Sequence, residues 1–187
     1  GLRVPMIVRW PASKQVGRSY GELISSIDFA PTVLDLAGIT PPAGADIDGR
    51  SYRAVLEGSE APIQDAIFSE LGSARSVKTK KWKYIAVRYT EEEQAKIARG
   101  EKFQGFPGAR APDRPYYSRN SHLGFYASSA NPHYFEIDQL YDLEADPKEE
   151  RNVFAEHPDV VAEMRERLAT WLRTFPDRPY GEFTRPF

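Results

Sequence analysis

The first apolar run of the chain extends from Val4 to Trp10 and has prolines near both ends. A short, continuous apolar run predicts a β-strand that is covered on both faces, as in a mostly parallel sheet between helices. The chain begins without an initiator methionine, so we expect residues 4–10 to be the last strand of a sheet whose other strands precede this sequence. An ordinary hairpin strand is the alternative.

Apolar residues then recur at helical spacing from Phe29 to Ala37, and Gly38 ends the pattern. This spacing predicts an amphipathic helix that stops at a glycine in the C′ position. We expect Asp28 to cap this helix by accepting hydrogen bonds from the free N–H groups of its first turn, and we favour that role over metal binding. Turn residues at 41–49 lead to a second, short helix at 52–56.

The pattern changes near Pro62, where we place a domain boundary. Short runs of β-branched and aromatic residues follow and predict a four-stranded antiparallel sheet. The expected strands are residues 66–71, 74–79, 81–89 and 136–143. Apolar residues at helical spacing from Pro158 to Phe175 predict one long helix across that sheet, and Asp146-Pro147 predicts a short helical turn before it. Residues 63–187 are therefore expected to form an α+β unit, and residues 1–62 the end of an α/β domain.

Residues 89–135 interrupt the predicted sheet between its third and fourth strands. They open with a capping box at Thr90, which predicts a helix that ends near Arg99. The rest of the interruption is rich in aromatic residues and proline, with arginine and histidine interleaved. Disordered segments avoid aromatic residues, so we expect this stretch to pack on something. Aromatic faces beside guanidinium groups suit a ligand with sugar-like faces and anionic groups. Burial against a missing part of the molecule is the alternative.

Composition narrows the function without naming it. The 187 residues carry 25 Lys and Arg against 27 Asp and Glu, a formal charge of −2, which argues against a nucleic-acid binder. The absence of cysteine removes disulfides, thiolate metal sites and cysteine nucleophiles. No apolar run is long enough to predict a membrane span, no signal peptide opens the chain, and the three histidines lack the spacing of a metal site. We find no self-contained set of catalytic residues.

Several short segments, taken together and in order, match the pattern of a known protein family, although each alone would be a weak signal. In order, they are Gly1-Leu2-Arg3-Val4-Pro5 with Trp10-Pro11, Asp28-Phe29-Ala30-Pro31-Thr32, Asp48-Gly49-Arg50-Ser51, Lys83-Tyr84-Ile85, Leu140-Tyr141-Asp142-Leu143 with Asp146-Pro147, and Glu150-Arg151-Asn152. Through these segments the chain resembles the C-terminal portion of a type I sulfatase, a formylglycine-dependent, arylsulfatase-like member of the alkaline-phosphatase-like superfamily. The resemblance covers nearly the whole chain except residues 89–135.

The resemblance implies a sulfuric ester hydrolase. In the family, a formylglycine made from the Cys or Ser of a Cys/Ser-x-Pro-x-Arg motif is the nucleophile, and Ca²⁺ polarises the sulfate group. Both precede the Arg-Val-Pro segment in the family, so we expect the nucleophile and the Ca²⁺ site upstream of Gly1. We expect neither catalytic nor metal-binding residues in this chain, and the fragment alone should hydrolyse nothing.

In the family, the C-terminal α+β subdomain lies beside the active-site cleft, so the resemblance assigns substrate recognition to this chain. The expected substrate is a sulfated carbohydrate or another sulfate ester, and the expected partner is the missing N-terminal catalytic part. The candidate substrate-binding residues, none of which matches a family motif, are Arg114, Tyr116, Tyr117, Arg119, His122 and His133. The family also implies a periplasmic or extracellular location.

Two other functions fit the same residues. One is the C-terminal half of a related phosphodiesterase or phosphonate hydrolase, whose upstream nucleophile would be an unmodified Ser or Thr. The other is a non-catalytic carbohydrate-binding module that is stable by itself. The apolar strand expected at residues 4–10 argues against the second alternative, because an uncovered sheet edge favours aggregation.

Overall fold

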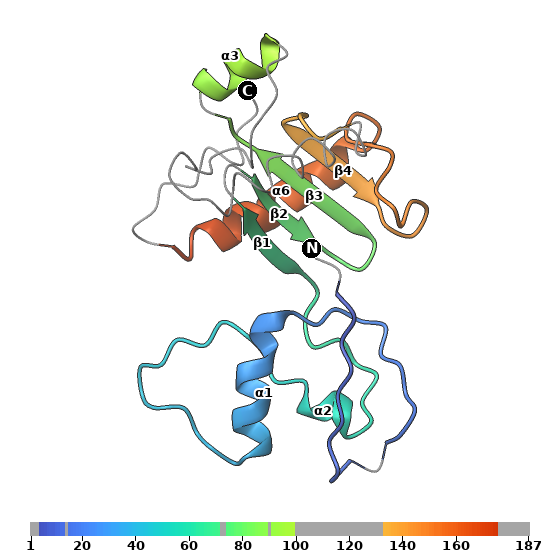
Figure 1. Ribbon diagram of the computed structural model, residues 1–187, viewed down its shortest axis with the longest axis vertical. Helices are drawn as coiled ribbons and strands as arrows, with labels where there is room; N and C mark the ends of the chain where they lie inside the picture. Colours follow the sequence, from blue (N-terminus) through green and yellow to red (C-terminus); the bar gives the residue numbers. More distant parts are fainter. Residues whose placement is uncertain (1–3, 14, 72–73, 90, 100–132, 176–187) are drawn as a thin grey trace, which may run out of the picture. The chain divides into compact units, whose positions relative to one another are not determined.

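The computed structural model describes residues 4–13, 15–71, 74–89, 91–99 and 133–175 (Figure 1). The chain divides into two compact units, unit 1 (Gly1–Ile67) and unit 2 (Phe68–Phe187). The boundary predicted from the sequence lies between residues 62 and 63. Unit 1 contains short helices and their connections, whereas unit 2 contains nearly all of the sheet.

Unit 1 contains a 3₁₀ turn, η1 (Ser26–Asp28), that leads directly into helix α1 (Phe29–Leu36). The short helix α2 (Arg53–Leu56) follows later in the chain. Both helices lie where the sequence predicted them. Gly38 follows α1 with a φ of 67°, the left-handed conformation that ends many helices and that glycine adopts without strain.

The carboxylate of Asp28 is fully buried and accepts three hydrogen bonds from separate segments of unit 1. Its donors are the backbone N–H of Ser25 at 2.7 Å, the backbone N–H of Arg50 at 2.8 Å and the side-chain amide of Gln64 at 2.8 Å. The predicted capping of α1 is wrong, because the Asp28 side chain makes no capping bond to that helix. The carboxylate joins three parts of unit 1 instead.

Thr32 extends the same junction one helical turn further. Its hydroxyl donates to the backbone carbonyl of Asp28 at 2.6 Å and accepts from the backbone N–H of Tyr52 at 3.0 Å. Gly49 approaches so closely that a Cβ atom there would stand 2.1 Å from the carbonyl oxygen of Ile27. Only glycine therefore lets this segment come near enough to form these hydrogen bonds.

Residues 4–10 form no strand in the described part of the chain, although we predicted one. A β-strand requires a hydrogen-bonded neighbour, and none of the described strands pairs with these residues. Their side chains are mostly exposed, and Ile7 is 95% exposed. The predicted burial of both faces is therefore not met within this chain.

Unit 2 is built on an antiparallel sheet with the strand order β1-β2-β3-β4 (Figure 1). The strands are β1 (Ile67–Leu71), β2 (Ala74–Lys78), β3 (Trp82–Val87) and β4 (Asp138–Asp142). Each lies within its predicted range, so the predicted four-stranded sheet is confirmed. Tyr84 pairs with Leu140, and Ala86 pairs with Asp138, so β3 and β4 are neighbours across the 89–135 interruption.

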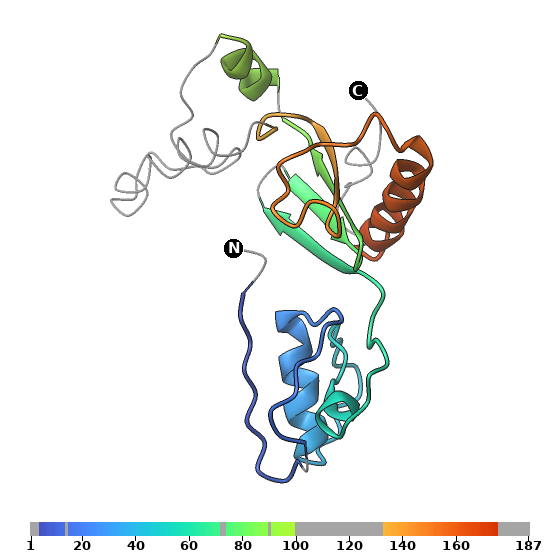
Figure 2. The ribbon, with the colours of Figure 1, turned by 90° about the vertical axis from the view of Figure 1, so that its right-hand side faces the viewer.

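The long helix α6 (Pro158–Leu172) lies across one face of the sheet and packs against β2 and β3 (Figure 2). Its buried residues belong to the predicted apolar stripe and are Val161, Met164, Leu168 and Leu172. Trp171 stacks on Phe68 of β1 with ring centroids 5.0 Å apart, so the helix also reaches the edge strand. The predicted helix across an antiparallel sheet is confirmed.

The connection from β4 to α6 consists of turns, and at the predicted helical turn the backbone N–H of Glu149 donates to the carbonyl of Asp146 at 3.1 Å. The carboxylate of Asp142 holds the first turn, since it accepts from the backbone N–H groups of Glu144 and Ala145 at 3.0 and 3.1 Å. Glu149 then has a φ of 60°, a left-handed conformation that costs a non-glycine residue roughly 1–2 kcal/mol. An ion pair with Lys83 of β3 holds Glu149 in this position.

Helix α3 (Glu91–Ala98) agrees with the helix predicted at the start of the 89–135 interruption. Residues 100–132 lie outside the described part of the chain. Among the described helices, none is long and apolar enough to cross a lipid bilayer.

The Gly49→Ala substitution should destabilise unit 1 by about 3 kcal/mol, because the new methyl group collides with backbone that cannot move aside cheaply. Native-state hydrogen exchange should show the loss at the amides of Arg50 and Tyr52, which bond to Asp28 and Thr32. Gly21→Ala is the matched control, because a Cβ there meets open space. Equal protection in the two variants would contradict the close approach of this segment.

Candidate functional site

The polar residues at the base of the 89–135 interruption form the candidate functional site. Five of the six predicted substrate-binding residues lie outside the described residues and stay predictions, namely Arg114, Tyr116, Tyr117, Arg119 and His122. The sixth, His133, is described and lies shortly before β4. Two polar clusters surround this position, one formed by His133 and Glu136 with Asn152 and the other centred on Asp138.

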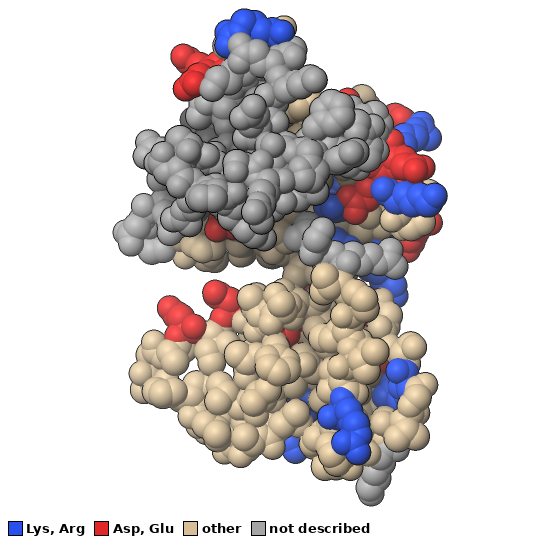
Figure 3. All heavy atoms as spheres, in the orientation of Figure 1, with Lys and Arg blue, Asp and Glu red and all other residues tan. Residues whose placement is uncertain are grey.

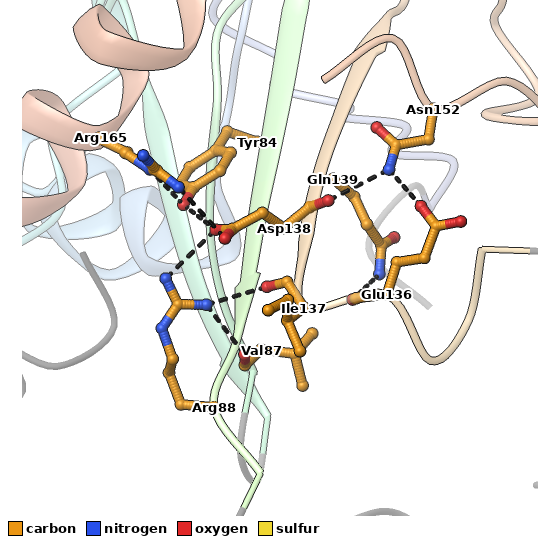
Figure 4. Close-up of polar contacts among 9 residues, drawn as sticks. All are labelled: Tyr84, Val87, Arg88, Glu136, Ile137, Asp138, Gln139, Asn152 and Arg165. Atoms are coloured by element: carbon orange, nitrogen blue, oxygen red, sulfur yellow. Dashed lines mark hydrogen bonds and ion pairs between the residues drawn. The ribbon is translucent and has the colours of Figure 1, made fainter. Parts of the chain in front are cut away.

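A tight turn brings His133 against Glu136. The backbone N–H of Glu136 donates to the carbonyl of His133 at 3.0 Å, and the imidazole Nδ1 lies 2.7 Å from Glu136 Oε1. The other carboxylate oxygen of Glu136 accepts from the side-chain amide of Asn152 (Figure 4). Partial burial raises the pKa of Glu136, but the hydrogen bonds from His133 and Asn152 outweigh it and hold the pKa below its ordinary value.

Asn152 fixes this cluster to the edge of the sheet. Its side-chain oxygen accepts from the backbone N–H of Leu140 at 2.8 Å and from that of Phe154 at 3.1 Å. Its amide also donates to the backbone carbonyl of Asp138 at 3.1 Å (Figure 4). Asn152 therefore satisfies backbone groups of β4 while it orients the carboxylate of Glu136.

Asp138 binds two arginines from different elements. Arg88, which follows β3, donates to one carboxylate oxygen at 3.2 Å, and Arg165 of α6 lies 3.1 Å from the other oxygen. The Tyr84 hydroxyl donates to Asp138 and accepts from Arg165 Nε at 3.1 Å (Figure 4). Tyr84 is fully buried and the three charged side chains are largely buried. This ionic cluster therefore joins β3, β4 and α6.

Arg88 also closes the base of the 89–135 interruption. Its guanidinium donates to the backbone carbonyls of Val87 and Ile137, both at 2.9 Å. The backbone N–H of Val87 donates to the carbonyl of Ile137 at 2.8 Å. The residues on the two sides of the interruption are therefore tied directly to each other.

The Asp138 cluster keeps Tyr84 protonated. Burial raises the pKa of the Tyr84 hydroxyl to about 12, and the hydrogen bond to Asp138 adds to this shift, because a phenolate beside a carboxylate is disfavoured. Burial by itself would lower the pKa of Arg165, but the hydrogen bond with Tyr84 and the charge of Asp138 raise it. The cluster therefore holds Tyr84 as a neutral hydrogen-bond donor beside the Asp138 carboxylate.

The two units differ in surface chemistry. Acidic and basic side chains alternate on the described part of unit 2, whereas much of the visible face of unit 1 is uncharged (Figure 3). Exposed large apolar side chains of unit 1 are Val4, Met6, Ile7, Val8, Val16, Ile27, Phe29, Val33, Ile39 and Ile47. In α1, Phe29 and Val33 of the predicted apolar face are exposed, and Thr32 is the buried residue.

The described residues do not fit a metal centre. No group of three or more histidine, aspartate or glutamate side chains in the described part of the chain is arranged to hold a metal ion. The two clusters offer an oriented imidazole and a largely buried ionic anchor.

Residues 1–99 match the family described as "N-sulphoglucosamine sulphohydrolase, C-terminal". The match covers more than half of the 187 residues, so the chain belongs to this sulfatase C-terminal family. The predicted resemblance to the C-terminal portion of a sulfatase is confirmed.

Relatives named as sulfatases align with nearly the whole chain. An ulvan-active sulfatase of Formosa agariphila is 26% identical over 192 residues, which cover 95% of this chain and 34% of the relative. An N-acetylgalactosamine-6-O-sulfatase of Bacteroides thetaiotaomicron is 29% identical over 169 residues, which cover 90% of this chain and 27% of the relative. The chain therefore spans no more than about a third of either relative.

The solved structure of a 2-O GAG sulfatase shares the fold of this chain. The two superpose with a TM-score of 0.57 at 20% identity, over 89% of this chain and 29% of the other. The likeness supports the α+β arrangement of sheet and helix.

Sequence reasoning predicts a role for His133 but misses the residues that hold it and the whole Asp138 cluster. Glu136 and Asn152 are 16 positions apart, and nothing local links them. The available signal is the Glu150-Arg151-Asn152 segment, which contributes to the family resemblance and supplies the amide that organises the edge of β4.

Replacing Asp138 by Asn should destabilise unit 2 by about 3 kcal/mol, because it leaves Arg88 and Arg165 as largely buried cations without their counter-charge. Urea unfolding followed by tryptophan fluorescence measures this in a Trp10→Phe background, where Trp82 and Trp171 of unit 2 are the remaining reporters. Glu163→Gln is the control, since it breaks an exposed pair with Arg167 and should cost at most about 0.5 kcal/mol. A loss for Asp138→Asn as small as the control's would show that the cluster is not a structural anchor.

Unit 2 should lose stability as the pH rises from about 10 to about 12. The folded-state pKa of Tyr84 is raised, so the folded state binds more protons than the unfolded state in this window, and unfolding becomes easier by about 1.4 kcal/mol per pH unit. In the same fluorescence assay, the free energy of unfolding should fall less steeply with pH across this range for Tyr84→Phe than for the wild type. Identical slopes for the two proteins would contradict the raised pKa.

Proposed function

We propose that this chain is the C-terminal part of a sulfatase that hydrolyses sulfate esters of a carbohydrate, and that it contributes to substrate recognition. The family match over residues 1–99 carries this proposal. It is supported by relatives that align with 90% or more of the chain and are named as sulfatases active on ulvan or on N-acetylgalactosamine 6-O-sulfate.

The exposed apolar side chains of unit 1 support the proposal that this chain is part of a larger protein. Val4, Ile7 and Val8 of the first segment, with Phe29 and Val33 of α1, present apolar side chains that a separate, self-sufficient domain would bury. We place the catalytic part of the sulfatase against this surface. In that assembly residues 4–10 gain the strand neighbours that they lack among the described residues.

The catalytic part supplies the chemistry in this proposal. A formylglycine nucleophile and a Ca²⁺ ion that polarises the sulfate belong to that part, since the described residues of this chain fit neither a metal site nor the nucleophile motif. The same part carries the export signal, and the protein acts in the periplasm or outside the cell.

The recognition residues in this proposal are Arg114, Tyr116, Tyr117, Arg119, His122 and His133. Arginine donates two parallel hydrogen bonds to an oxyanion, and aromatic rings pack on sugar faces, so the 89–135 interruption has suitable chemistry for a sulfated sugar. The contact between His133 and Glu136 is the described geometry that supports this assignment.

The reading frame upstream of Gly1 should encode a Cys- or Ser-x-Pro-x-Arg motif together with acidic metal-binding segments. The protein expressed from that longer frame should release sulfate from a panel of ulvan, N-acetylgalactosamine 6-sulfate and N-acetylglucosamine 6-sulfate. The 187-residue chain alone should release none, and an Ala variant of the motif's Cys or Ser should be inactive.

Three outcomes would contradict the proposal. A Ser or Thr nucleophile without the motif, together with phosphoester cleavage, would favour a related phosphodiesterase or phosphonate hydrolase. A stop codon or an unrelated domain upstream, together with a stable chain that binds glycans, would favour a non-catalytic binding module. Sulfate release by the 187-residue chain alone would show that the catalytic residues lie in this chain and not in the part upstream of it.

A further inference from the structure

We infer that His133 recognises a free hydroxyl group of the sulfated saccharide through its Nε2 atom, which Glu136 makes a hydrogen-bond acceptor. This inference rests on the proposed function and assigns one recognition contact to a named atom. It also gives Glu136 and Asn152 a positioning role that sequence reasoning misses.

The first step is the rigid placement of the imidazole. The turn from His133 to Glu136 closes with a backbone hydrogen bond of 3.0 Å, so both side chains leave the same turn. Asn152 binds the carboxylate of Glu136 and is itself bonded to the backbone of β4 through Leu140. A continuous chain of hydrogen bonds therefore connects the imidazole to β4.

The second step is the tautomer of the imidazole. Two hydrogen bonds favour the ionised carboxylate of Glu136 and lower its pKa, so this group is an acceptor only. Nδ1 of His133, 2.7 Å from Glu136 Oε1, must then carry the proton. In a neutral imidazole this leaves Nε2 with a lone pair and no hydrogen.

The third step is the ligand chemistry that suits such an atom. Nε2 makes no hydrogen bond within the described part of the chain, and the His133 side chain is 25% exposed. Sulfate oxygens are acceptors only and cannot bond to a lone pair, whereas a sugar hydroxyl donates readily. A neutral His133 therefore selects an unsulfated position of the sugar over a sulfated one.

Aromatic residues complete the surroundings of His133. Tyr134 and Phe135 follow directly and meet edge to face with ring centroids 5.0 Å apart, and Phe135 is partly exposed. Aromatic rings commonly line ligand pockets in which a few polar atoms fix the orientation of the ligand, and Phe135 supplies such a ring two residues after His133.

Nitrogen NMR of the 187-residue chain tests the tautomer without any ligand. At a pH of about 8.5, above the usual titration range of imidazole, His133 should show a protonated Nδ1 and an unprotonated Nε2. Glu136→Gln should reduce this preference, while Glu144→Gln, an exposed control in the turn after β4, should leave it unchanged. A proton on Nε2 of the neutral wild-type ring would overturn the inference.

Binding at the same pH tests the contact itself. NMR titrations compare N-acetylglucosamine 6-sulfate with the same sugar whose free hydroxyls are capped as methyl ethers. The wild-type chain should bind the uncapped sugar about five- to tenfold more tightly, the strength of one hydrogen bond. His133→Phe should lose this preference, and His157→Phe, which changes a histidine packed on Trp82, should keep it.

The outcomes separate this inference from the proposed function. If wild type and His133→Phe bind the uncapped sugar equally, His133 reads no hydroxyl, and recognition by other residues of the chain stands. If the wild-type chain binds neither sugar, and the longer protein inactivated at the motif's Cys or Ser also binds neither, both the inference and the proposed recognition role are overturned. Loss of preference in His133→Phe with binding retained for the capped sugar supports both.

Discussion

A buried carboxylate must be surrounded by donors, because leaving it without partners costs far more than the hydrogen bonds return. Each unit of this chain is organised around one such group. Asp28 draws Ser25, Arg50 and Gln64 together in unit 1. In unit 2, Asp138 draws in Arg88, which follows β3, and Arg165 of α6. The fold of each unit depends on this requirement, since the helices of unit 1 are short and contribute little apolar burial of their own.

The two carboxylates act differently because their partners differ. Asp28 accepts from neutral donors, two of them backbone N–H groups, so it fixes the path of the chain. Asp138 binds charged side chains, so it fixes how one element packs on another. Asp138 is also linked to Glu136, because the side-chain amide of Asn152 donates both to the Glu136 carboxylate and to the backbone carbonyl of Asp138. The residues at the start of β4 therefore both stabilise unit 2 and position the side chain of Glu136.

The sequence predicts the elements of this fold better than their contacts. Alternating and helical spacing locate β3, β4 and α6, because burial of one face imposes a period on the sequence. The Asp138 cluster is missed, because Tyr84 and Asp138 are 54 positions apart and Arg165 and Tyr84 are 81 positions apart. Asp28 is misread as a helix cap, because an aspartate before a helix has the same local pattern in both roles. His133 is found through its unusual surroundings, while the residues that orient it have no local signal.

The closed base of the 89–135 interruption has an evolutionary consequence. Val87 and Ile137 are hydrogen-bonded, and Arg88 spans both, so the described contacts that close the sheet at this point involve no residue between 100 and 132. The entropy of closing a flexible loop grows slowly, by about 0.6 kcal/mol for each doubling of its length. Changes of length within residues 100–132 are therefore cheap for the scaffold, whereas Arg88 and the buried Tyr89 are required by it. Under the proposed function, substrate preference can change there while β3, β4 and α6 remain the same.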